Sequence, residues 1–204
     1  MSKPTLKAWK AAIHLLAWLQ SQRLRGVAFR SDGNLILEAT CDASNHTDPK
    51  DAKALVGYTM HLAGGPIASS SQKFVRSVSA PGHEYLALYP CATHIIWFRQ
   101  LVIELGLAEV FLNGPTALHC DNTVAIDWVK FGKVTPGNRG IQVRYREVDD
   151  WSKAGLIHMK YVPTIDNRSD LMSKPVKSNV INRLLLWLCG YVLEPQQENV
   201  AQVK

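Results

Sequence analysis

The hydrophobic pattern of the chain changes between residues 73 and 84, and this change limits the folds that the sequence can adopt. Before it, short apolar runs are separated by turn signals such as Asp32-Gly33 and Gly64-Gly65-Pro66. Runs of this length joined by Gly-containing turns are typical of antiparallel strands. The first half therefore predicts an antiparallel meander, with strands expected at 26–29, 35–41, 55–62 and 67–73.

After the change, helical and strand patterns alternate. Apolar residues at helical spacing from Glu84 to Leu105 end at Gly106, and Pro90 is expected to kink this helix. A helix also precedes the meander, at 5–22. Further helices are expected at 122–130, 139–154 and 179–189, and further strands at 116–120 and 157–162. Such an order implies a mixed sheet flanked by helices.

Composition indicates a soluble globular protein that needs no cross-links. The chain has 204 residues, 47% apolar and 20% charged, so it can bury a sizeable core. Its four cysteines are single, without a CxxC pair, which argues against a zinc ribbon or a thioredoxin-like motif. The N-terminus lacks a signal-like apolar run, and Leu184–Leu193 is shorter than the roughly 20 residues that span a bilayer. We expect an intracellular protein of the cytoplasm or nucleus, with no membrane partner.

Basic residues are concentrated in two segments. The formal net charge is +6, and residues 1–31 and 128–146 carry basic side chains without any acidic one. Clustering of this kind is the electrostatic footprint of a nucleic-acid-binding protein. The alternative is a solvated basic face without a partner. The basic residues are Lys3, Lys7, Lys10, Arg23, Arg25 and Arg30 in the first segment, and Lys130, Lys133, Arg139, Arg144 and Arg146 in the second.

Four acidic residues stand at the boundaries of the expected elements. Asp42 and Asp121 each follow a strand, Glu84 opens the long helix, and Asp170 lies after the last strand. If the two strands are neighbours, their carboxylates meet at one edge of the sheet. Converging carboxylates suit a hard divalent cation such as Mg²⁺. Alternatively, each acid could have a purely structural role in a turn or as a helix cap. Asp121, for example, could cap the helix expected from Asn122.

Five ordered blocks of sequence carry a resemblance to a known family. They are Ala8-Trp9-Lys10-Ala11-Ala12-Ile13; Cys41-Asp42-Ala43 with Gly57-Tyr58 and Gly64-Gly65-Pro66-Ile67; His83-Glu84-Tyr85-Leu86-Ala87-Leu88; Leu118-His119-Cys120-Asp121-Asn122; and Tyr161-Val162-Pro163-Thr164 with Asp170-Leu171-Met172-Ser173-Lys174-Pro175. With this order and spacing, the chain resembles the ribonuclease H domain of copia-type LTR retrotransposon polyproteins, which follows reverse transcriptase.

The resemblance implies a fold and a domain plan. The expected fold is α/β, a ribonuclease H-like mixed five-stranded sheet, in which an antiparallel meander is followed by parallel strands and helices flank the sheet. Residues 1–25 would form an N-terminal linker helix, 26–175 the ribonuclease H-like domain, and 176–204 a C-terminal helix and flexible tail.

It also implies a reaction, the metal-dependent endonucleolytic hydrolysis of the RNA strand of RNA/DNA hybrids with two Mg²⁺ ions or with Mn²⁺. Carried over residue by residue, the catalytic metal ligands fall on Asp42, Glu84, Asp121 and Asp170. Asp42 would bridge both metals, Glu84 and Asp121 would complete one shell, and Asp170 would hold the other ion.

The resemblance and the charge pattern together suggest how a hybrid would bind. Basic residues would hold phosphates, and polar residues near the acids could contact ribose. For the polar residues, a turn or cap role is the alternative. The candidate nucleic-acid-binding residues are Asn45, Asn122, Lys130, Lys133, Arg139 and Asn167.

Several positions depart from the family pattern. Ser44 and Asn45 replace an acidic and an aromatic residue, and Gly82 replaces an acidic one. Gly140 stands where a histidine is common, and Pro90 interrupts a regular helix. None removes a metal ligand. They leave open a domesticated, non-catalytic module that acts as a structural or nucleic-acid-binding subunit of a larger assembly, with reverse transcriptase or another protein as its partner.

Overall fold

The computed structural model of the chain describes residues 5–30, 35–44, 54–73, 80–131 and 142–191. Five strands form one sheet in the order β3-β2-β1-β4-β5. The strands are β1 (Leu37–Ser44), β2 (Leu55–Leu62), β3 (Gly65–Lys73), β4 (Thr116–Cys120) and β5 (Ile157–Tyr161). β1, β2 and β3 pair antiparallel, whereas β1–β4 and β4–β5 pair parallel. The expected mixed sheet, a meander followed by parallel strands, is confirmed.

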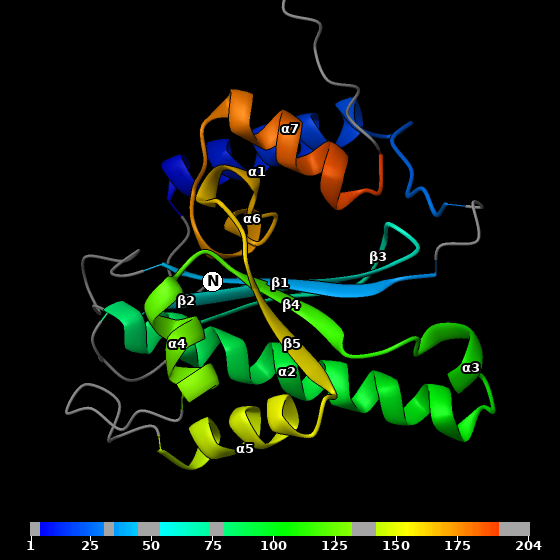
Figure 1. Ribbon diagram of the computed structural model, residues 1–204. Helices are drawn as coiled ribbons and strands as arrows, with labels where there is room; N and C mark the ends of the chain where they lie inside the picture. Colours follow the sequence, from blue (N-terminus) through cyan, green and yellow to red (C-terminus); the bar gives the residue numbers. More distant parts are fainter. Residues whose placement is uncertain (1–4, 31–34, 45–53, 74–79, 132–141, 192–204) are drawn as a thin grey trace, which may run out of the picture.

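One face of the sheet carries the apolar core. Successive side chains of a strand point to opposite faces, so Leu37, Ala39, Cys41 and Ala43 of β1 all enter the core cluster. Three helices cover this face: α2 (Ala80–Glu104), α4 (Thr123–Phe131) and α5 (Gln142–Lys153) (Figure 1). The short helix α3 (Ala108–Phe111) follows α2.

Helix α2 is the central core helix of this layer. Tyr85, Leu88 and Ile95 are fully buried against the sheet, and the helix continues through Pro90. Among the described residues, Gly82–Glu104 is long and apolar enough to cross a membrane by length and composition alone. Its packing against the sheet accounts for part of that apolar composition, since 39% of this apolar stretch is buried.

The opposite face of the sheet is polar and is covered by the C-terminal part of the chain. There the 3-10 turn η2 (Thr164–Asp166) precedes the helices α6 (Asp170–Ser173) and α7 (Ser178–Leu188), and the last two lie over the sheet in Figure 1. The fully buried Leu184 of α7 anchors that helix, and His61 Nε2 lies 3.2 Å from the Leu188 carbonyl oxygen. Helix α7 is thus in direct contact with the body of the fold.

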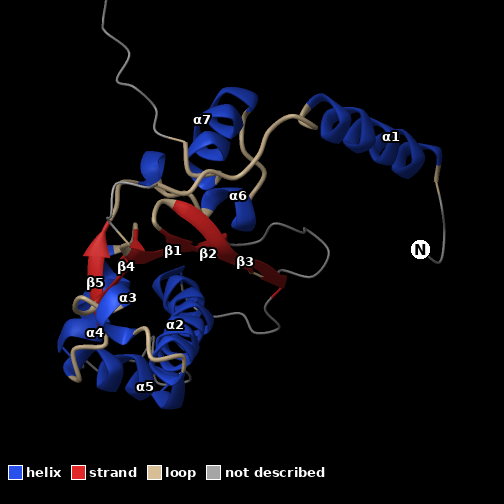
Figure 2. Ribbon diagram, turned by 90° about the vertical axis from the view of Figure 1, so that its right-hand side faces the viewer, coloured by secondary structure: helices blue, strands red, loops and turns tan. Residues whose placement is uncertain are grey.

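Helix α1 (Leu6–Ser21) stands apart from this body. Thr5 Oγ1 accepts a hydrogen bond from the Ala8 amide and caps the helix. No residue of α1 is buried, and Figure 2 shows the helix extending away from the sheet. Its apolar side chains, among them Trp9 and Leu16, are exposed.

One expected strand is wrong. Residues 26–29 form no strand. Instead, the Ala28 amide donates to the Cys189 carbonyl, and the Arg30 amide donates to the Ala63 carbonyl. The segment is therefore held by isolated hydrogen bonds to the end of α7 and to the β2–β3 turn. The hairpin turn expected at 31–34 lies outside the described residues.

Candidate metal centre

Asp42 is held on the polar face of the central strand. It is 1% exposed and pairs in register with Gly57 of β2. Ser173 Oγ donates a hydrogen bond to its Oδ2, and Lys174 Nζ lies 3.5 Å from the same oxygen. Burial raises the pKa of Asp42 above its usual value, although Ser173 and Lys174 act in the opposite direction.

Asp121 reaches the same edge because β1 and β4 are parallel neighbours. The cap alternative does not hold for this residue: Asn122 Oδ1 accepts the Ala125 amide at 3.0 Å and so caps α4. The carboxylate of Asp121 instead accepts a hydrogen bond from Thr164 Oγ1 at 2.8 Å. Asp121 is therefore oriented by a side chain from beyond β5 and does not begin the helix.

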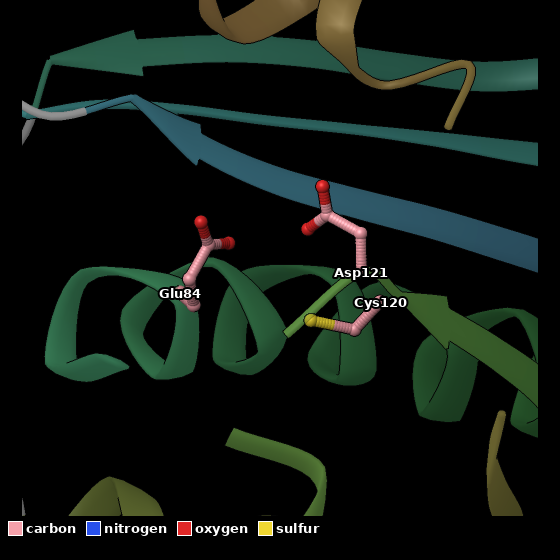
Figure 3. Close-up of side chains that lie close together, drawn as sticks. All are labelled: Glu84, Cys120 and Asp121. Carbon is pink, nitrogen blue, oxygen red and sulfur yellow. The ribbon is translucent and has the colours of Figure 1, made fainter. Parts of the chain in front are cut away.

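Glu84 approaches from the other layer, on the first turns of α2. Its Oε2 accepts the amide of Ala43, next to Asp42, at 3.1 Å. Figure 3 shows the carboxylates of Glu84 and Asp121 both pointing toward β1. Burial, followed by the negative charges of Asp42 and Asp121, raises the pKa of Glu84 to about 9.

Asp170 completes the group from the first position of α6. It is 6% exposed, and its Oδ1 lies 2.8 Å from Lys174 Nζ, one helical turn later. Burial raises the pKa of Asp170 to about 6, and the charges of Asp42 and Asp121 contribute, while Lys174 opposes them. For Lys174, burial is outweighed by these carboxylates, so its pKa lies above the usual value.

The four acids thus come together in two overlapping groups. Ligand atoms of Asp42, Asp121 and Asp170 lie within 4.8 Å of one another, and so do those of Glu84, Cys120 and Asp121. The fully buried Cys120 belongs to the apolar core, and its thiol is a poor ligand for a hard cation. The remaining donors are carboxylate oxygens that repel one another. Their chemistry and spacing fit a divalent cation such as Mg²⁺.

The polar residues expected to contact nucleic acid have structural partners. Asn167 is fully buried: its Nδ2 donates to the Cys41 carbonyl at 3.0 Å, and its Oδ1 accepts the Ser169 amide. Asn122 caps α4, as described. Both therefore fit the turn or cap alternative better than a contact with ribose. Lys130 is exposed on the last turn of α4. Asn45, Lys133 and Arg139 lie outside the described residues.

Three residues of the site were not singled out from the sequence as site residues: Thr164, Ser173 and Lys174. Thr164 and Ser173 each donate a hydrogen bond to one of the acids, and Lys174 forms ion pairs with two of them. For Lys174 a local signal exists, since a basic residue four positions after an acid faces it on a helix. No local signal pairs Thr164 with Asp121 or Ser173 with Asp42, because those contacts join distant segments.

No protein-family model matches the chain. The chain is 27% identical over 177 residues to the retrovirus-related Pol polyprotein from transposon RE2 of Arabidopsis thaliana. The aligned region covers 86% of this chain and 12% of the polyprotein. It is 26% identical over 181 residues to the corresponding polyprotein from transposon TNT 1-94 of Nicotiana tabacum, which covers 88% of this chain and 13% of that protein. The chain therefore spans only a small part of the relatives it matches.

A solved structure shares the architecture. LC11-RNase H1, isolated from compost by a metagenomic approach, is 12% identical with a TM-score of 0.52, over 74% of this chain and 99% of that one. LC11-RNase H1 in complex with an RNA/DNA hybrid is 11% identical with a TM-score of 0.49, over 73% of this chain and 99% of that one. The chain is thus a homologue of the retrovirus-related Pol polyproteins of plant transposons and has a ribonuclease H-like fold.

Proposed function

We propose that the chain is the ribonuclease H domain of a copia-type LTR retrotransposon, which hydrolyses the RNA strand of RNA/DNA hybrids endonucleolytically with divalent metal ions. One observation carries the proposal. Asp42, Asp121 and Asp170 approach one another within 4.8 Å, with Glu84 beside Asp121, on the ribonuclease H-like sheet of a Pol polyprotein homologue.

The acids would hold the metal. Asp121 belongs to both groups, so in this arrangement it would be the ligand that the two groups share. The resemblance assigns that shared role to Asp42 instead. Asp42 and Asp170 would complete one group and Glu84 the other. When bound, divalent cations lower the pKa of a water nucleophile and stabilise charge on the attacking and leaving oxygens of a phosphodiester.

The chain itself prepares these ligands. Thr164 orients Asp121 through its hydroxyl, and the Ala43 amide fixes Glu84. Glu84 must lose its proton before it can act as a ligand, because metal binding requires the ionised carboxylate. Because the pKa of Glu84 is about 9, binding of the metal would be coupled to release of the Glu84 proton.

The proposed substrate class is supported by the relatives and by the charge pattern. The LC11 ribonuclease has been solved with an RNA/DNA hybrid, and reverse transcription of a retrotransposon produces such hybrids. The basic segment at 128–146, which includes Lys130, Lys133 and Arg139, would hold phosphates, as basic side chains commonly do. Selection of the RNA strand would rest on its 2′-hydroxyls.

The test is cleavage of an end-labelled RNA/DNA hybrid with Mg²⁺ or Mn²⁺. We expect metal-dependent cutting of the RNA strand that falls on the order of a hundredfold or more in Asp121→Asn. Asp127→Asn is the matched control, since Asp127 is exposed on α4, and it should cut normally. A folded chain that binds the hybrid without cutting would indicate a binding module or an enzyme that needs reverse transcriptase. Neither cutting nor binding would favour a structural subunit.

A further inference from the structure

A cation of the chain already lies within the acidic group. Lys174 Nζ is 2.8 Å from Asp170 Oδ1 and 3.5 Å from Asp42 Oδ2. Both carboxylates are nearly inaccessible, with side chains 8% and 1% exposed, whereas the Lys174 side chain is 31% exposed. Two oxygens that belong to the proposed metal ligands are therefore paired with an ammonium group that retains a path to water.

The backbone around Lys174 is firmly attached to the sheet. Ser71 Oγ donates to the Met172 carbonyl at 2.6 Å, and Ser44 Oγ donates to the Ser173 carbonyl at 2.5 Å. Lys174 is the residue that follows α6. These contacts fix where its side chain begins, while the flexible stem leaves the ammonium group free to turn toward solvent.

Two other cation pairs of the described residues lie away from the acidic group. Lys153 and Asp149 form a similar pair, four residues apart, at 2.6 Å on α5. Arg168 pairs with Glu38 at 3.1 Å. Neither Asp149 nor Glu38 belongs to a group of converging acidic ligands. Lys174 differs from Lys153 and Arg168 because both of its partners, Asp42 and Asp170, are proposed metal ligands.

We propose that Lys174 is the chain's own counter-ion for Asp42 and Asp170, and that it competes with divalent metal for these carboxylates. The proposal rests on the proposed function, since it requires the acids to bind metal. Two buried carboxylates cost free energy when their charge is uncompensated. Lys174 compensates them in the metal-free chain, and the metal must displace it. Folding would then not depend on metal, at the expense of a weaker metal affinity.

The experiment compares the full chain with Lys174→Gln, Lys174→Arg and the matched control Lys153→Gln. Mg²⁺ binding is measured by isothermal titration calorimetry, and thermal unfolding is measured in EDTA and in Mg²⁺. We expect Lys174→Gln to melt at a lower temperature than the parent in EDTA and to bind Mg²⁺ about tenfold more tightly, because removing a nearby positive charge favours a cation. Lys174→Arg should stay close to the parent. Lys153→Gln should leave Mg²⁺ affinity unchanged.

Each result has a defined meaning. If Lys174→Gln is unfolded in EDTA, Mg²⁺ must restore its folding, and failure to do so overturns the inference. Equal or weaker Mg²⁺ binding by Lys174→Gln overturns the inference alone, provided that the parent cleaves the hybrid. If neither protein binds Mg²⁺ and neither cleaves, the inference and the proposed function both fall.

Discussion

At the scale of single residues, the site is a set of carboxyl groups that the fold holds against their electrostatic preference. Burial and mutual repulsion raise the pKa of Glu84 to about 9 and that of Asp170 to about 6. Hydrogen bonds from Ala43, Thr164 and Ser173 fix the positions of the acids. Perturbed pKa values cluster at functional sites, which agrees with the proposed role of these acids as metal ligands.

Replacing Glu84 by Gln should remove a pH dependence of stability in the absence of metal. The folded chain keeps the Glu84 proton up to about pH 9, whereas the unfolded chain loses it near the ordinary value of 4.5. The protonated Glu84 therefore contributes fully to the free energy of unfolding below pH 4.5. This contribution decreases as pH rises above 4.5 and is gone once pH exceeds about 9.

Urea unfolding in EDTA, at about pH 5 and about pH 8.5, measures this effect. The parent should lose on the order of 4 kcal/mol more than Glu84→Gln between the two pH values, because each pH unit inside this window costs about 1.4 kcal/mol. Asp127→Gln, an exposed change on α4, should follow the parent. Equal losses in parent and Glu84→Gln would show that Glu84 titrates normally.

At the scale of elements, the site depends on how closely α6 lies on the sheet. Gly57, opposite Asp42 in the β1–β2 register, has no side chain, and the backbone of residues 172 and 173 packs against it. A Cβ at position 57 would lie 2.5 Å from the Met172 Cβ and 2.8 Å from its carbonyl carbon. Gly57 therefore sets the height of α6, and with it the positions of Asp170 and Lys174.

Gly57→Ala should push α6 away from the sheet and cost about 1–3 kcal/mol of unfolding free energy. It should also weaken Mg²⁺ binding, because Asp170 would move away from Asp42. Gly26→Ala is the control: its Cβ would meet only the Tyr191 hydroxyl at 3.9 Å. Denaturant unfolding and calorimetry measure both effects. Unchanged stability and metal affinity in Gly57→Ala would contradict the close packing described.

At the scale of the whole molecule, the two terminal helices have different roles. Helix α7 contributes the fully buried Leu184 to the polar-face layer, and α1 buries no residue. The apolar side chains of α1 therefore add little to the stability of the described fold. Helix α7, within the part predicted at 176–204, contacts β2 through His61 and the Leu188 carbonyl.

This contrast is measurable with two leucine truncations. Leu184→Ala should cost about 2–4 kcal/mol, because it leaves a cavity in a packed layer. Leu16→Ala, at a position 60% exposed, should cost less than about 0.5 kcal/mol. Urea unfolding of both variants checks the difference. Similar costs at the two positions would mean that α1 packs on the chain more tightly than described.

The sequence alone predicted the five strands of the sheet in their order, together with a strand at 26–29 that is wrong, and it singled out four acids that the fold brings together. The strand at 55–62 was predicted with its observed bounds, and the helix at 5–22 was predicted within one residue at each end. Periodicity and capping are local properties, so they can be read without the fold. Asp42, Glu84, Asp121 and Asp170 were found through blocks of residues at recognisable spacing.

The tertiary structure decided what depends on contacts between distant segments. Residues 26–29 have a strand-like composition, but their hydrogen-bond partners are the β2–β3 turn and the end of α7. Asn122, and not Asp121, caps α4, which leaves Asp121 for the acidic group. The position of Lys174 over Asp42 depends on α6 packing on Gly57. Local sequence patterns determine which acidic and basic residues stand at the ends of helices and strands. Long-range packing determines which of these charges meet, because the free energy of their interaction depends on their distance and burial.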